Sequence, residues 1–280
     1  MTTALLGIAL ALVSAISWGS GDFSGGYATR RLNQFQAVAL SGLTGLALLL
    51  ALALARREPF PSANETLWII SAGIAGSLGL AALYRALSWG ETAMVAPIAA
   101  VIGAALPVLF SLIILGLPKT TQLLGFFVAL AGIWLVTRTP STATTFSRHH
   151  LFLAVAAGLG FGGFFILLAQ AHTSLVFSPL VIARLTMVGV ALLFLLRSRV
   201  PFPNPRAHPV AILAGILDTG GNVFYLMATQ FTRLDIAAVL ASLYPAITVL
   251  LARLLLRERV SANQWQGVVL CLAAITLIAL

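Results

Sequence analysis

Apolar residues occur in ten long runs that are separated by short polar connections. Crossing about 30 Å of hydrocarbon takes roughly 20 apolar residues in a helix. The runs therefore predict membrane helices at 4–24, 34–55, 67–87, 92–115, 120–137, 150–170, 176–196, 209–229, 235–256 and 262–280. The connections between them are too short to hold a soluble domain on either side.

The second half of the chain repeats the first at an offset of 142 residues without a gap. Matching pairs include Phe35 with Phe177, Pro59-Phe60-Pro61 with Pro201-Phe202-Pro203, Gly79 with Gly221, Gln122 with Gln264 and Gly125 with Gly267. This pattern divides the chain into a first five-helix repeat at 1–140, a Thr- and Ser-rich linker at 141–149 and a second repeat at 150–280. Because each repeat has an odd number of spans, we expect an all-α membrane protein built from two inverted repeats.

Composition agrees with a membrane protein and excludes several other classes. The chain is 60% hydrophobic and 8% charged, whereas a soluble domain has roughly a quarter of charged residues. The mean hydropathy is +1.04. The net charge of +9 does not indicate nucleic-acid binding, because the basic residues lie singly or in pairs between apolar runs. Cys271 is the single cysteine, so no internal disulfide and no cysteine-based metal site is expected, and no cleaved signal peptide is expected before the first run.

The distribution of basic residues predicts the orientation. With the amino terminus inside, the inner loops would carry Arg56, Arg57, Lys119 and Arg233. The outer loops would carry Arg30, Arg31, Arg85, Arg138, Arg148, Arg197, Arg199, Arg206, Arg257 and Arg259. Because short-loop Lys and Arg favour the cytoplasm, the count favours both termini outside.

Few ionisable side chains lie within the predicted spans. Asp218 is near the middle of the eighth, Arg184 is well inside the seventh, and Asp22 is near the end of the first. Such groups are expensive in a membrane and mark a pathway or a pair. Asp218 and Arg184 have Gly76 and Gly42 as their repeat counterparts, so the scaffold does not require a charge at either position. We predict that the two are coupled, either in a polar central cavity that binds substrate or as a buried pair that locks two helices together.

Aromatic and proline residues give further candidates. Trp18, Tyr84, Tyr225 and Tyr244 are candidate cavity-lining residues, although aromatic rings in membrane proteins often face lipid or the interface. Pro97 and Pro107 are expected to interrupt the fourth span, and Pro245 the ninth, which is the matching helix of the other repeat. Paired interruptions indicate hinges at the substrate site, and a static kink is the alternative for each.

Motifs for catalysis are absent from the sequence. There is no phosphate-binding Gly-Lys-Ser/Thr loop, no His-x-x-x-His and no Gly-x-Ser-x-Gly element, and carboxylates are few. We therefore expect no catalytic residues, no metal site, no cofactor and no ATP-driven transport within this chain.

Three local features resemble a known family. Trp18-Gly19-Ser20 ends the first span, and Tyr244-Pro245 is followed thirteen residues later by Glu258. With ten spans in two repeats, this pattern is similar to EamA-type proteins of the drug/metabolite transporter superfamily. The first repeat departs from the pattern, because Gly103 occupies the place of Pro245 and residues 115–118 lack the acidic residue. The resemblance implies a ten-helix transporter of small metabolites, amino acids or drugs, often directed outward.

Asp22 has two interpretations. A carboxylate in the first helix resembles the acidic residue with which the small four-helix multidrug exporters of the same superfamily exchange protons. The alternative is an aspartate satisfied by backbone amides at a Gly-rich helix end. We expect a secondary transporter in a bacterial plasma membrane, as monomer or homodimer, with a small-molecule substrate, the lipid bilayer and protons as partners. A non-transporting membrane receptor or assembly subunit is the competing hypothesis.

Overall fold

The computed structural model describes residues 3–88, 92–138, 148–171, 174–197, 199–257 and 260–280. Regular structure in these ranges is helical, with ten candidate membrane spans that confirm the predicted runs to within a few residues. The helices are α1 (Thr3–Ala28), α2 (Gln34–Ala55), α3 (Ala63–Ser88), α4 (Thr92–Ile114), α5 (Thr120–Thr137), α6 (Arg148–Gln170), α7 (Phe177–Arg197), η1 (Pro205–Ala207), α8 (Pro209–Thr229), α9 (Leu234–Ala241), α10 (Tyr244–Leu255) and α11 (Ala262–Ala279). The ninth span consists of α9 and α10. Most of the predicted linker lies outside the described residues.

Polar side chains at the loop ends define where several helices begin. Asn33 accepts from the Phe35 amide at 2.9 Å, and the Gln36 side chain accepts from the Asn33 amide at 3.0 Å. Ser261 and Gln264 form the same reciprocal cap at the start of α11. These bonds satisfy helix-end amides that have no intrahelical partner, which is essential where the ends approach a membrane.

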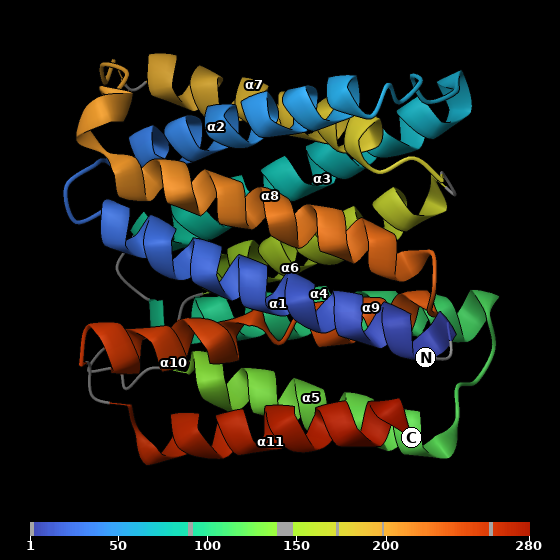
Figure 1. The fold of residues 1–280 in the computed structure, drawn as a ribbon. Helices are drawn as coiled ribbons and strands as arrows, with labels where there is room; N and C mark the ends of the chain where they lie inside the picture. Colours follow the sequence, from blue (N-terminus) through green and yellow to red (C-terminus); the bar gives the residue numbers. More distant parts are fainter. Residues whose placement is uncertain (1–2, 89–91, 139–147, 172–173, 198, 258–259) are drawn as a thin grey trace.

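Helices of one half pack against helices of the other (Figure 1). α1 packs chiefly on α8 and α3 chiefly on α6, while α2 pairs with α7 and α5 with α11. Figure 1 shows the α2–α7 pair at one face of the bundle and the α5–α11 pair at the opposite face. Each pairing maps onto itself or onto its counterpart when the halves are exchanged, so the two five-helix halves are related by a pseudo-two-fold axis.

Equivalent hydrogen bonds support this relation at the α5–α11 contact. Gln122 donates to the Ile278 carbonyl at 3.5 Å, and Gln264 donates to the Val136 carbonyl at 3.4 Å. Both the two donors and the two acceptors are 142 residues apart. The repeated glutamines therefore make the same contact to the opposite half, which explains why the sequence repeats them.

The loops after α2 and α7 make a second equivalent contact. The Gln36 side chain donates to the Pro201 carbonyl at 2.8 Å, and its counterpart Ser178 donates through Oγ to the Pro59 carbonyl at 2.9 Å. Glu58 adds an asymmetric element, because its carboxylate accepts from the Phe177 and Ser178 amides at 2.8 Å and so caps α7. A carboxylate at a helix N-terminus stabilises that helix. The Pro-Phe-Pro motif thus marks loops that dock onto the other half.

Large apolar side chains are exposed on the outside of the bundle. Leu54 of α2 is 76% exposed, Phe127 of α5 is 67% exposed and Leu272 of α11 is 60% exposed. A water-soluble monomer rarely carries apolar surface on this scale. The outer surface is therefore suited to contact with lipid acyl chains.

Both chain termini lie at the same end of the bundle (Figure 1), as an even number of spans requires. We expect both to be extracytoplasmic because the basic-residue count favours that orientation. A carboxy-terminal fusion to alkaline phosphatase should then be active, and a fusion to green fluorescent protein should be dark. A dark phosphatase fusion with a bright fluorescent one would reverse the orientation and leave the fold unchanged.

Candidate functional site

Arg184 of α7 and Asp218 of α8 form an ion pair near the middle of their spans. The Arg184 Nη2 atom donates to Asp218 Oδ2 at 2.5 Å and to Thr219 Oγ1 at 2.9 Å. The two charges are thus in direct contact, and their energetic coupling stays a prediction. Pairing lowers the cost of placing both charges inside an apolar bundle.

Glycines on neighbouring helices make room for this pair. A Cβ atom on Gly45 of α2 would collide with Thr219 Oγ1 and lie 3.2 Å from Arg184 Nε. A Cβ atom on Gly21 of α1 would lie 3.0 Å from the Asp218 amide nitrogen. Two further helices therefore approach the pair closely because they present no side chain there.

The two partners differ in accessibility. The Arg184 side chain is 8% exposed, whereas the Asp218 side chain is 39% exposed. An accessible carboxylate in the middle of a membrane span would be costly if it faced lipid. The open side of Asp218 is therefore suited to a polar or cationic group.

Asp22 belongs to the same group of charges. Asp22 follows Gly21, and its carboxylate interacts electrostatically with the Asp218 carboxylate and with the Tyr244 hydroxyl. Asp22 is an exposed residue. In the part of the chain that the structure describes, it has no ion-pair partner, whereas Asp218 is paired with Arg184.

The predicted aromatic residues form one cluster beside these charges. The Trp18 ring lies 5.6 Å from Phe165, 5.9 Å from Tyr225 and 6.4 Å from Tyr244, measured between centroids. Tyr225 is fully buried and donates its hydroxyl to the Phe165 carbonyl at 3.0 Å. Trp18 is 9% exposed, and Tyr244 is half-buried. Tyr225 therefore forms the fully buried part of the cluster, and Tyr244 presents the more accessible ring.

Tyr84 lies in α3, but its side chain lies outside what the structure describes. The sequence pattern did not single out Thr219, whose Oγ1 atom accepts a second hydrogen bond from Arg184 Nη2. No sequence signal separates such a hydroxyl from those that bond to their own helix, as Thr44 does with Leu40.

The three candidate hinge prolines have different surroundings. The ninth span is broken at Ser242 and Leu243, directly before α10. Pro245 lies in the first turn of α10. α4 continues as a helix through both Pro97 and Pro107, so the fourth span has no break like that of the ninth, and the hinge role of these two prolines stays a prediction. α6 packs closely on α4 at the second proline, because a Cβ atom on Gly162 would lie 3.1 Å from the Gly103 carbonyl oxygen, the group that Pro107 leaves without an intrahelical donor.

Within the described ranges, no group of three or more His, Cys, Asp or Glu residues is arranged to hold a metal ion. The Arg184–Asp218 pair, Asp22 and Tyr244 are contributed by α7, α8, α1 and α10. The arrangement can hold a small solute by charge pairing and by contact with an aromatic ring.

Comparison with known proteins gives one family and a structural relative. The EamA-like transporter family matches residues 5–138 and again residues 149–280. No curated protein sequence shows significant similarity to the chain. A solved structure titled "Crystal structure of protein" has a TM-score of 0.73 and 19% identity, covering 97% of this chain and 95% of its own. At that identity the likeness extends to the fold alone.

Proposed function

Because the chain belongs to the EamA-like transporter family, a family of membrane transporters and not of enzymes, we propose that it is a secondary transporter of small organic solutes. The solute binds at Arg184, Asp218 and Asp22 and crosses by alternating access. The transporter acts in a bacterial plasma membrane, as a monomer or homodimer. Its proposed direction is export, in exchange for protons.

The observation that carries this proposal is the charge balance of the site. Arg184 is engaged by Asp218 and Thr219, the Asp218 carboxylate is accessible, and Asp22 adds a second carboxylate nearby. A substrate amine can replace the guanidinium at Asp218, and a substrate carboxylate can then bind the released Arg184. Amino acids and organic amines fit this chemistry, with the aromatic ring of Tyr244 beside them.

Proton exchange follows from the same balance. With all three groups ionised, two carboxylates and one guanidinium leave one excess negative charge in an apolar surrounding, which favours uptake of a cation. A proton and a substrate ammonium group can each supply that charge. Competition between them couples solute export to proton entry.

The broken ninth span supports a moving element beside the site. Tyr244 begins α10, and its backbone carbonyl faces Gly19, where a Cβ atom would be 2.5 Å away. Discontinuous helices near the membrane midplane are a recurrent feature of carriers that alternate between two inverted repeats. We propose that Ser242, Leu243 and Pro245 form the hinge.

Uptake into proteoliposomes tests the function. Purified protein should accumulate or exchange at least one solute from a panel of amino acids, nucleosides and cationic drugs, with transport increased by a pH gradient. Empty liposomes and liposomes with Asp218→Asn give the matched controls. Absence of transport across the panel with either gradient direction would favour a non-transporting receptor or assembly subunit.

A further inference from the structure

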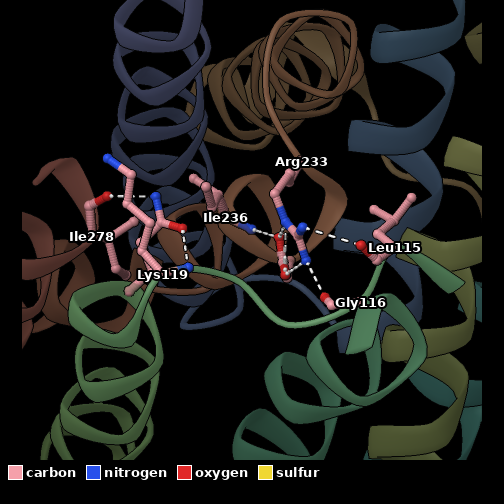
Figure 2. A network of polar contacts seen from close by, with 8 residues as sticks. Leu115, Gly116, Lys119, Arg233, Ile236 and Ile278 are labelled. Atoms are coloured by element: carbon pink, nitrogen blue, oxygen red, sulfur yellow. Dashed lines mark hydrogen bonds and ion pairs between the residues drawn. The ribbon is translucent and has the colours of Figure 1, made fainter. Parts of the chain in front are cut away.

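The end of the bundle that carries both termini is bridged by a polar network (Figure 2). Arg233, directly before α9, donates through Nη2 to the Gly116 carbonyl at 2.8 Å and through Nη1 to the Leu115 carbonyl at 3.5 Å. These carbonyls directly follow Ile114, the last residue of α4. A cation is favoured at a helix C-terminus. The guanidinium therefore connects the end of α4 in the first half with the start of α9 in the second.

Asp235 holds the guanidinium in place. Its side chain is fully buried and accepts from Arg233 Nη2 at 2.9 Å, from Arg233 Nε at 3.2 Å and from the Ile236 amide at 2.9 Å. A buried carboxylate is costly without partners, so Asp235 requires both the arginine and the helix N-terminus. We call Arg233, Asp235 and the two carbonyls the latch.

The repeat does not encode a copy of the latch at the other end. Glu91 and Ala93 occupy the places of Arg233 and Asp235 in the first half of the sequence. Glutamate has no hydrogen to donate to a carbonyl, and alanine has no carboxylate to hold an arginine. The two ends of the inverted repeat are therefore unequal in chemistry.

Packing of the ninth span is also unequal along its length. α4 packs against α9, whereas α10 packs chiefly against α1 and α5. The fourth and ninth spans are thus held together in the half that carries the latch. In the last turn of α4, where its carbonyl accepts from the Leu115 amide, Ser111 has a fully buried hydroxyl with no hydrogen-bond partner among the described residues.

We infer that the latch is the gate at this end of the transporter and biases the substrate-free protein towards the conformation closed there. The inference rests on the proposed function, because a gate has meaning only in a protein that alternates its access. Opening requires the carbonyls of Leu115 and Gly116 to leave Arg233. It also brings the buried Ser111 hydroxyl into contact with water.

Thiol labelling in detergent tests the latch without any substrate. The reporter is Ser111→Cys in a protein whose buried Cys271 is replaced by serine. Arg233→Gln should raise the maleimide labelling rate of this reporter by about tenfold or more, because charge-assisted hydrogen bonds hold the closed state. Asp235→Asn should give a smaller increase, because Arg233 keeps its carbonyl partners. Arg206→Gln, an exposed arginine in η1, is the matched control and should have no effect.

The native Cys271, only 3% exposed in α11, distinguishes opening from general loosening. With Ser111 intact, Arg233→Gln should leave the labelling rate of Cys271 unchanged. An equal increase at both thiols would identify Arg233 as a stability residue and overturn the gate. Unchanged labelling at Ser111→Cys in both latch variants would overturn it as well. If the reporter is labelled as expected but the transport assay fails, the proposed function is refuted, whereas the two-state bundle is retained.

Discussion

Arg184→Gln is expected to destabilise the protein by about 2–4 kcal/mol and to abolish uptake. Removing one partner of a buried ion pair costs about 3–5 kcal/mol, and hydration of the accessible Asp218 carboxylate recovers part of this. The double variant Arg184→Gln with Asp218→Asn should be more stable than the Arg184→Gln single variant, because it leaves no carboxylate at position 218 without its arginine partner. The coupling energy should be about 1–3 kcal/mol, measured by thermal unfolding of all four proteins in one detergent.

Uptake by the double variant decides between the two roles of the pair. If the charges bind substrate, the double variant recovers stability without recovering uptake. If the pair only locks α7 to α8, the neutral double variant transports at a rate near that of the native protein. Arg206→Gln, at an exposed position in η1, should change stability by less than about 0.5 kcal/mol. Strictly additive effects on stability would contradict the coupling.

The second large effect is expected at Gly160 in α6. A Cβ atom there would lie 2.5 Å from the Gly79 Cα atom and 2.7 Å from the Ala75 carbonyl oxygen of α3. Both are backbone atoms and cannot rotate away, so alanine must force α3 and α6 apart. Gly160→Ala should therefore destabilise the protein by about 3 kcal/mol or more, at or above the upper end of typical overpacking costs.

Gly163 provides a matched control in the same helix. Its Cβ atom would meet only the Ala75 Cβ atom, at an ordinary contact distance of 3.6 Å. Gly163→Ala should be neutral or should stabilise by up to about 1 kcal/mol, because alanine favours a helix more than glycine does. Thermal unfolding of both variants checks the prediction. Equal effects would show that α3 and α6 are less closely packed than the structure indicates.

The α3–α6 contact and its symmetry counterpart, the α1–α8 contact beside the site, differ in their side chains. Position 160 corresponds to Trp18, and Gly79 corresponds to Gly221, against which the Trp18 ring packs. In the α3–α6 contact two glycines let the backbones touch, whereas in the α1–α8 contact an indole fills the same space. The repeat thus preserves the helix pairing while the side chains differ, and the charged site lies beside the tryptophan.

The sequence by itself determined the number of spans, their approximate ends and the two-fold repeat. Hydrophobic length reports these features directly, because a helix must be long enough to cross the hydrocarbon and must satisfy its own backbone. The sequence also selected Arg184 and Asp218. Charged residues are rare within these apolar spans, and two of opposite sign have few ways to be stable other than as partners.

Only the tertiary structure decided which other groups meet that pair. Asp22 approaches Asp218 and Tyr244 because glycines allow α1 to pack closely against α8 and α10, and a repeat pattern gives no register for contacts between helices. Asp235 is the first residue of the predicted span 235–256, and its complete burial beside Arg233 is visible only in the folded bundle. The ninth span is broken just before Pro245, whereas α4 continues through its two prolines, so the missing backbone donor alone does not decide whether a helix continues.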